Sequence, residues 1–197
     1  MLKMPKKIES ERIVLVRPYP PTFKMAKEIF AKVDLSRKTL REWLPWVDNT
    51  KTPEDEFAHW LINWAQQNWN EGKGFAYLIR HKKTNVVLGT VDLLRYIEQN
   101  KSAEIGYWLS TDAVGHGYMS EAVRALENIA FAQGLNRIVI ANDTENTSSA
   151  NVPKRCGYHL DGIMRQEQWS EELQSFRDMN VWSKLKSEWL KEQKKKQ

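Results

Sequence analysis

A short glycine-containing segment has the residue types and the position needed to bind an anion through its backbone. Gly115-His116-Gly117 follows a predicted strand at Ala103–Leu109 and leads directly into a predicted helix over about 118–133. The first N–H groups of a helix are unpaired and point one way, the helix dipole adds positive charge, and glycine lets a bulky anion approach. The segment matches neither the Walker motif nor the three-glycine dinucleotide fingerprint. It therefore predicts a pyrophosphate site, with a turn that needs positive φ as the alternative explanation.

The cysteine and histidine content gives no sign of a metal site or a disulfide. Cys156 is the only cysteine, and no Cys/His cluster has the spacing of metal ligands. No apolar run approaches the roughly 18–20 residues that cross a membrane, and the basic start of the chain is not followed by the apolar segment of a secretory signal. We therefore expect a protein of a reducing compartment, the cytoplasm, with no metal and no membrane contact.

Hydrophobic periodicity predicts a mixed order of strands and helices on both sides of the glycine segment. The predicted strands lie at Arg12–Arg17, Phe75–Arg80, Val86–Leu94, Ala103–Leu109, Arg137–Ala141, 158–165 and 176–184. The predicted helices lie at 22–33, 36–44, from Thr52 to Gly72, 118–133 and 147–156, and a last polar helix closes the chain.

The order of these elements indicates the fold class. One strand–loop–helix–strand unit lies in the middle of a sheet whose other strands we expect to be antiparallel. This arrangement predicts an α+β fold with a mixed, mostly antiparallel central sheet and helices on both faces. At roughly 150 residues per domain, the 197 residues make a single domain, which we place at 8–190.

The net charge of +5 is concentrated at the two ends of the chain. Residues 1–7 carry +3 and residues 184–197 carry +4, so that residues 8–183 sum to −2. A nucleic-acid-binding protein collects its basic residues on a folded face. We therefore expect solvated basic tails at 1–7 and 191–197 and no specific nucleic-acid partner. Whether these tails contact RNA weakly stays open.

Three segments in register resemble the GNAT superfamily of acetyl-CoA-dependent N-acetyltransferases. They are Glu104-Ile105-Gly106-Tyr107-Trp108-Leu109, the Gly115–Gly117 segment, and Asn146-x-x-Ser149-x-x-Val152-x-x-Arg155-x-Gly157-Tyr158. Their order and spacing look more narrowly like the RimJ/RimL branch, which acetylates N-terminal amines of ribosomal proteins. The resemblance runs from Arg12 to about Trp189. It implies a single-domain GNAT-like fold and acetyl-CoA as the co-substrate.

The resemblance implies a set of coenzyme-binding residues. The backbone N–H groups of six consecutive residues would hold the pyrophosphate of coenzyme A: Val114, Gly115, His116, Gly117, Tyr118 and Met119. Met119 replaces a small residue of the family pattern and would crowd the phosphates unless its side chain points into the core. The backbone of Leu109 would pair with the pantetheine arm where the strand Arg137–Ala141 separates from it. Asn146 would bond the pantetheine, cap the following helix, or do both.

The resemblance also implies an acid for the departing thiolate. In many members this acid is a tyrosine seven residues after the motif asparagine, where the present chain has Pro153. In the RimL-like branch a serine three residues after that asparagine lies near the sulfur, and Ser149 matches it. Ser149 is therefore the candidate acid, with a local bond to the helix backbone as the alternative. Proline at 153 also frees the carbonyl group of Ser149, four residues earlier.

Two glutamates are candidates for the base that takes the proton of the amine. Glu104 stands where the histone-acetyltransferase branch has its catalytic glutamate, and burial in a cleft can raise the pKa of a carboxyl toward neutrality. An ion pair with a nearby Arg or Lys is the alternative role for it. The RimL-like branch uses a glutamate nineteen residues after its serine, a position held here by Gln168 with Glu167 beside it. Glu104 is therefore the leading candidate, and Glu167 requires a one-residue slip.

The acceptor amine is the part of the function that the sequence leaves open. We expect an N-terminal amine of a ribosomal or other protein, and Trp43-Leu44-Pro45-Trp46 lies in the region that shapes the acceptor site in the RimJ/RimL branch. A small amine such as a polyamine, an amino acid or an aminoglycoside is the alternative, for which Asp48 and Glu54–Glu56 are the obvious acids. A coenzyme-A-binding module without turnover is a third possibility. The oligomeric state, monomer or homodimer, also stays open.

Overall fold

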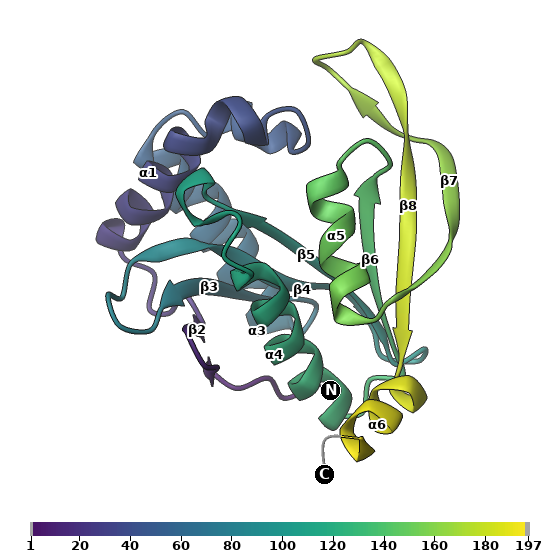
Figure 1. Ribbon diagram of the computed structural model, residues 1–197. Coiled ribbons are helices and arrows are strands. Elements are labelled where there is room, and N and C mark those ends of the chain that lie inside the picture. The colour runs from purple at the N-terminus through teal and green to yellow at the C-terminus, as the bar shows by residue number, and fades with distance from the viewer. Residues whose placement is uncertain (1, 196–197) are drawn as a thin grey trace.

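The computed structural model describes residues 2–195 as one eight-stranded sheet flanked by helices (Figure 1). The strands lie in the order β1-β2-β3-β4-β5-β6-β8-β7. Their bounds are β1 Lys7–Glu9, β2 Ile13–Val16, β3 Phe75–His81, β4 Val87–Ile97, β5 Ser102–Leu109, β6 Arg137–Asp143, β7 His159–Ser170 and β8 Ser175–Leu185. Only β5 and β6 are parallel, and the other neighbours in the sheet are antiparallel. The predicted α+β fold with a mixed, mostly antiparallel sheet is confirmed.

The helices cover both faces of this sheet (Figure 1). Their bounds are α1 Phe23–Leu40, the 3₁₀ turn η1 Pro45–Asn49, α2 Pro53–Asp55, the π-helix η2 Glu56–Gln66, α3 Gln67–Glu71, the 3₁₀ turn η3 Thr111–Ala113, α4 Tyr118–Ala132, α5 Thr147–Cys156 and α6 Lys186–Lys194. The helix predicted from Thr52 to Gly72 runs without a break through α2, η2 and α3. A capping box between Thr52 and Asp55 starts it, and Gly72, at φ 67°, ends it. Within residues 2–195, no helix is long and apolar enough to span a membrane.

One local prediction was wrong, and one short strand was missed. The helices predicted at 22–33 and 36–44 form the single helix α1, because no glycine or proline interrupts the chain between them. Ser36, in the predicted second helix, is buried and its Oγ lies 3.2 Å from Ser110 Oγ, which fastens α1 to the end of β5. The strand β1 was missed because it is only three residues long and gives too short a pattern.

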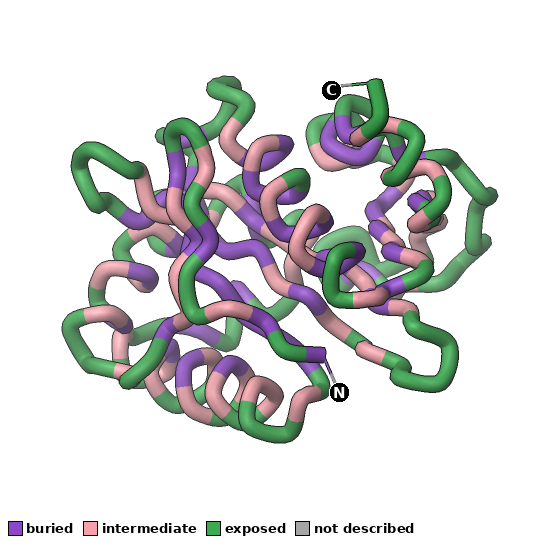
Figure 2. The backbone as a smooth tube through the Cα atoms, turned by 90° about the horizontal axis from the view of Figure 1, so that it is seen from below, coloured by how far each residue is buried: buried purple, intermediate pink, exposed green. Residues whose placement is uncertain are grey.

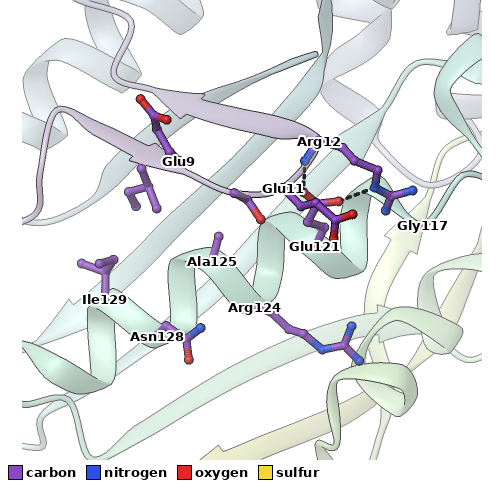
Figure 3. A pocket seen from close by; sticks show the side chains of 11 residues that line it. Glu9, Glu11, Arg12, Gly117, Glu121, Arg124, Ala125, Asn128 and Ile129 are labelled. Atoms are coloured by element: carbon purple, nitrogen blue, oxygen red, sulfur yellow. Dashed lines mark hydrogen bonds and ion pairs between the residues drawn. The ribbon is translucent and has the colours of Figure 1, made fainter. Parts of the chain in front are cut away.

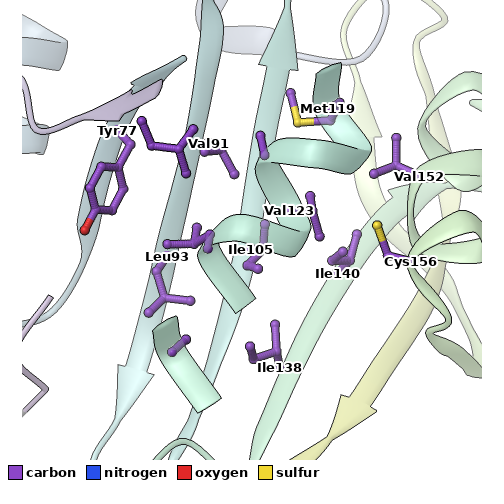
Figure 4. Packing of buried hydrophobic residues seen from close by; sticks show 14 of the residues in the cluster. Tyr77, Val91, Leu93, Ile105, Met119, Val123, Ile138, Ile140, Val152 and Cys156 are labelled. Carbon is purple, nitrogen blue, oxygen red and sulfur yellow. The ribbon is translucent and has the colours of Figure 1, made fainter. Parts of the chain in front are cut away.

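The hydrophobic core lies on both faces of the sheet. On one face α4 packs Met119, Ala122, Val123 and Leu126 against β4, β5 and β6 (Figure 4). On the other face a second cluster joins α1 and η2 to Leu78 of β3 and Trp108 of β5. Figure 2 shows the buried stretches along the central strands and the exposed ones in the outer loops. The middle strands are therefore fixed from both sides, and they carry the residues of the site described below.

The ends of the chain differ from the expected solvated tails. Leu2 and Met4 are buried in the core beside β1, although the proposed domain limits of 8–190 exclude them. Lys184, counted with the basic end, is fully buried in β8, where its Nζ lies 3.0 Å from Glu127 Oε1 and 2.7 Å from Glu192 Oε2. A buried lysine must be paired to keep its charge, so this position belongs to the packed domain. Residues 1 and 196–197 of the proposed tails lie outside the described residues.

Candidate active site

A slot between β5 and β6 forms the centre of the site. The two strands pair only at Ser102↔Arg137, Ala103↔Ile138 and Glu104↔Val139, and beyond these positions they separate toward their C-terminal ends (Figure 1). The backbone of β5 from residue 105 to 109 therefore has no strand partner on that side. A cavity of about 1030 Å³ fills this region, with lining residues from β5, the glycine segment, the start of α5, residues 39–49 and the β7–β8 hairpin. The predicted separation of the strand beginning at Arg137 is present.

The glycine segment forms the N-terminal end of α4 at one side of the slot. Gly115 and Gly117 have φ angles of 87° and 77°, which side chains with a Cβ rarely adopt, so the turn that was the alternative explanation is real. Gly117 is also the N-cap of α4 and has no side chain to bond the first N–H groups. A Cβ added at Gly115 would meet no atom within 4 Å. The segment thus combines free N–H groups with open space for an anion.

Arg12, near the start of β2, holds this segment from outside. Its Nη1 donates to the carbonyl oxygen of His116 over 2.9 Å, and its backbone N–H and Nε each donate to the carboxylate of Glu121 over 2.8 Å. Figure 3 shows the two bonds from Arg12 to Glu121 beside a second cavity of about 400 Å³ and close to Gly117. The guanidinium also lies over the ring of Tyr118, 5.0 Å from its centroid. These contacts fix the glycine segment and the first turn of α4 to the sheet.

The remaining residues of the predicted pyrophosphate loop lie as follows. Met119 is buried in the hydrophobic core and also lines the large cavity. Val114 and Tyr118 line the large cavity, and Val114 is exposed. The His116 ring stacks on Tyr118 and its Nδ1 lies 3.0 Å from the carbonyl oxygen of Val114. His116 is not among the residues that line the large cavity, and its contact with the coenzyme stays a prediction.

The start of α5 lies across the slot from β5 and presents polar groups. Asn146 is the N-cap, and its Oδ1 accepts a bond from the Ser149 N–H over 2.9 Å. Its capping role is confirmed, and its bond to pantetheine stays a prediction. The hydroxyl of Tyr107 on β5 lies 3.2 Å from Ser149 Oγ and donates to the Ser149 carbonyl oxygen over 3.1 Å. That carbonyl is the one that Pro153 was predicted to free.

Sequence reasoning gave Tyr107 no role. It lies 42 positions before Ser149, and no pattern within a single element connects them. Burial raises the pKa of the Tyr107 phenol above its ordinary value, so the group stays protonated at neutral pH. The only signal in the sequence was the Ser149 carbonyl group, which Pro153 leaves without a helical N–H donor. This signal indicates that a donor from another element bonds to the carbonyl oxygen, but it does not identify that donor.

Both candidate bases line the large cavity. Glu104 Oε2 accepts from Arg95 Nη1 over 2.8 Å, so the ion pair considered as its alternative role is present. Glu167 lies in an irregular part of β7, where the register shifts between Met164 and Gln168. Neighbouring residues of a regular strand face opposite ways. Because of the irregularity, Glu167 and Gln168 both line the cavity, and the geometry keeps both glutamates as candidates.

Two segments far apart in the sequence meet at the other end of the cavity. The guanidinium of Arg177 lies 4.9 Å from the ring centroid of Trp43 and donates to Asp143 Oδ1 over 2.9 Å. Arg41 Nε lies 3.9 Å from Glu172 Oε2 at the tip of the hairpin. The cavity lining carries eight acidic and four basic side chains: Glu42, Asp48, Glu104, Asp143, Glu145, Glu167, Glu171 and Glu172 against Arg41, Arg95, Arg155 and Arg177. This excess of carboxylates favours a cationic ligand.

Metal and thiol chemistry find no support among the described residues. No group of three or more His, Cys, Asp or Glu side chains in residues 2–195 has the geometry of a metal site. Cys156 is buried, and burial raises the pKa of its thiol to about 12, so it is a packing residue and not a nucleophile. The polar groups of the slot are therefore the backbone amides, the hydroxyls and the carboxylates named above.

Comparison with known proteins gives a consistent result. A model of the acetyltransferase (GNAT) domain family matches residues 14–159. The ribosomal-protein-serine acetyltransferase of Escherichia coli (strain K12) is 31% identical over 114 residues, which are 57% of this chain and 63% of that protein. YdaF of Bacillus subtilis (strain 168), a proposed ribosomal N-acetyltransferase, is 28% identical over 171 residues, 84% of this chain and 88% of that protein. The match to the E. coli protein thus spans less than two thirds of its length.

The solved structures share the fold. The structure of RimL, a ribosomal L7/L12 alpha-N-protein acetyltransferase in complex with coenzyme A, superposes with a TM-score of 0.82 at 24% identity. The superposition covers 91% of this chain and 97% of that chain. At this identity the likeness establishes the fold alone.

Proposed function

The chain belongs to the GNAT acetyltransferase domain family, and from this premise we propose that it acetylates the N-terminal amine of a ribosomal or other protein. Membership makes it an N-acetyltransferase with acetyl-CoA as its co-substrate. Among its relatives, the E. coli protein is a ribosomal-protein-serine acetyltransferase, which supports a protein N-terminus as the acceptor. A ribosomal acceptor would place the reaction in the cytoplasm.

The observation that carries the proposal is the slot itself. It connects free backbone N–H groups at the start of α4 with the carboxylate of Glu104, through a stretch of β5 that has no partner on β6. An extended chain such as pantetheine can bond to an unpaired strand edge. The six residues from Val114 to Met119 would hold the pyrophosphate, and Leu109 and Asn146 would contact the pantetheine. The open space at Gly115 and the buried side chain of Met119 fit this assignment.

The chemistry requires few groups. The neutral amine attacks the thioester carbonyl, the C–N bond forms, and the C–S bond breaks with its electron pair on sulfur. Glu104 would take the amine proton, directly or through one water, and Glu167 is the second candidate for that step. Ser149 would donate a hydrogen bond to the departing sulfur. Holding the two reactants together in the slot would contribute a further part of the rate.

The acidic lining of the cavity supports a cationic acceptor. A protonated N-terminus is attracted by an excess of carboxylates before it loses its proton. The same argument supports a polyamine, and Asp48, one of the acids expected for it, does line the cavity. Glu54, Asp55 and Glu56 are absent from the described lining, and Asp55 instead caps the backbone of Lys51 and Thr52. The small-amine acceptor is therefore the second candidate.

An acetyl-transfer assay of the purified chain tests this proposal. It uses acetyl-CoA with a panel of peptides with free N-termini, N-blocked peptides that contain lysine, and polyamines. We expect release of coenzyme A only with free N-termini and a gain of one acetyl group at the first residue by mass spectrometry. Faster turnover of polyamines would favour the second candidate. Binding of acetyl-CoA without transfer to any acceptor would indicate a module without turnover and contradict the proposal.

A further inference from the structure

Two hydroxyl groups meet on the wall of the slot, one on β5 and one at the start of α5. Tyr107 Oη lies within hydrogen-bond distance of both Ser149 Oγ and the Ser149 carbonyl oxygen, at 3.2 Å and 3.1 Å. Both residues line the large cavity. A phenol carries a single hydrogen, so it donates fully to only one of these oxygens at a time.

The backbone of Ser149 is fixed while its hydroxyl is not. The Ser149 N–H donates to the side chain of Asn146 over 2.9 Å. Its carbonyl oxygen would accept from the N–H of residue 153 in a regular helix, but Pro153 has none, so the phenol of Tyr107 takes that place. Two arrangements then differ only in hydrogen positions. In the first, Tyr107 donates to the carbonyl oxygen and accepts from Ser149 Oγ. In the second, Tyr107 donates to Ser149 Oγ.

We propose that Tyr107 is a positioning residue of the reaction: it donates its phenolic hydrogen to Ser149 Oγ and thereby directs the Ser149 hydroxyl hydrogen toward the leaving sulfur. The inference rests on the acetyl transfer proposed above and names the group that orients its donor. Negative charge that develops on the sulfur favours the second arrangement, because only that arrangement leaves the hydrogen of Ser149 free for the slot. No heavy atom has to move between the two.

The proton balance leaves Tyr107 unchanged. The amine loses one proton and the sulfur gains one, so the products are an amide and the coenzyme thiol. Ser149 stabilises the charge on the sulfur while the C–S bond breaks, and Tyr107 only donates a hydrogen bond. Burial raises the pKa of its phenol, which keeps the hydrogen in place over the pH range in which the amine reacts. The Tyr107–Ser149 pair thus brings a phenol from β5 to the start of α5. In this helix, Pro153 occupies the position that holds a tyrosine in many members of the family.

The test compares Tyr107→Phe with the unaltered chain in single-turnover acetyl transfer. A hydrogen bond to a group that becomes charged changes a rate by about 10- to 100-fold, so we expect a loss of that size with nearly unchanged affinity for coenzyme A. The selenoester analogue of acetyl-CoA leaves as a more acidic selenol and needs less help. With this donor the loss should shrink severalfold, whereas a residue that only supports the fold would give the same loss with both donors.

Two further variants complete the experiment. Ser149→Ala should show the same donor dependence, and the double variant should be little slower than either single one, because the two hydroxyls act as one unit. Tyr77→Phe is the matched control: it also removes a buried phenol that donates to a carbonyl oxygen, that of Pro5 over 2.7 Å, but Tyr77 lies two strands from Tyr107, on β3, and does not line the cavity. If the unaltered chain transfers acetyl, the inference would be overturned by a Tyr107→Phe variant that loses no rate, or that loses the same factor in rate with the thioester and the selenoester. Absence of transfer by the unaltered chain would instead refute the proposed function, and this inference with it.

Discussion

The two ends of the large cavity are built in different ways. At the coenzyme end, the free groups are backbone amides at the start of α4, and Arg12 ties that turn to the sheet through bonds to Glu121 and the His116 carbonyl oxygen. At the acceptor end, the lining consists mainly of side chains from residues 39–49 and from the β7–β8 hairpin. Those segments touch through Trp43 with Arg177 and through the long contact of Arg41 with Glu172.

This difference means that side-chain substitutions should change the acceptor end more readily than the coenzyme end. Backbone amides bind the same anion whatever the neighbouring side chains are, so we expect the coenzyme end to tolerate Val114 and Met119 in place of the family's residues. Exposed ion pairs contribute little stability, typically below about 1 kcal/mol. The tip of the hairpin, where Glu172 contacts Arg41, can therefore change its charge by substitution without loss of the fold, whereas Arg177 and Asp143 form a buried pair. We expect variants at the coenzyme end to affect all acceptors alike and variants at the other end to distinguish between them.

The largest effect is expected for Gly117→Val. A β-branched residue cannot adopt φ 77° without strain, and its side chain would approach Arg12 Nη2, which lies 3.5 Å from the position of the added Cβ. We expect affinity for acetyl-CoA, measured by calorimetry, to fall by more than about 100-fold, since three charge-assisted bonds or more would be displaced. Gly134→Val is the control, because Gly134 also has positive φ but lies in open space at the end of α4. Unchanged affinity in a folded Gly117→Val variant would contradict the whole coenzyme assignment.

The next effect concerns the base, at the boundary between the two ends. Glu104→Gln keeps the shape and loses the charge, and general-base catalysis contributes about 10²–10⁴-fold, so kcat should fall by that factor with unchanged coenzyme affinity. The loss should shrink at high pH, where the amine is already neutral. Glu28→Gln is the control, since it breaks a comparable ion pair with Arg80 away from the slot. A silent Glu104→Gln beside a strongly impaired Glu167→Gln would assign the base to β7.

The same division explains what the sequence predicted. The coenzyme end is local: a strand, a glycine segment and a helix follow one another, and the predicted helix at 147–156 has the bounds of α5. The acceptor end depends on contacts between residues more than a hundred positions apart, such as Trp43 with Arg177, and single-sequence periodicity contains no information on them. The pair Tyr107 and Ser149 was missed for the same reason. The charge of Lys184 was counted with the basic end of the chain, because its partner Glu127 lies on another element.

A third prediction tests the sheet beneath the acceptor end. Asp92 of β4 alternates with Val91 and Leu93, which face α4, so its side chain faces the side of the sheet covered by α1. Its Oδ1 is buried without a hydrogen-bond partner among the described residues, and burial raises its pKa to about 8. Between about pH 4 and about pH 8 the Asp92 carboxyl is therefore protonated in the folded chain and ionised in the unfolded chain. Stability contributed by the protonated group is complete below about pH 4 and is lost as the pH rises to about 8.

Asp92→Asn should accordingly raise the free energy of unfolding at pH 9, by roughly 2–5 kcal/mol, and change it far less at pH 4. Urea denaturation at the two pH values measures this. Asp112→Asn is the control of opposite sign: a hydrogen bond from Lys32 lowers the pKa of Asp112, so its loss should reduce stability at pH 9. Because the Asp112 side chain is 48% exposed, the reduction should be small. Equal effects of Asp92→Asn at both pH values would show that the buried carboxyl is not the titrating group.

The smallest effect is expected for Glu172→Gln at the tip of the hairpin. This change removes one carboxylate of the cavity lining and weakens the contact with Arg41, which spans 3.9 Å between exposed side chains. Kinetics with free N-terminal peptides should show a rise of about two- to fivefold in KM for the acceptor, larger for basic peptides and reduced by salt, with no change in KM for acetyl-CoA. Glu54→Gln removes an acid of the neighbouring helix that does not line the cavity and serves as the control. A Glu172→Gln variant that altered both KM values equally would mean that the two ends are coupled through the hairpin, contrary to the division drawn above.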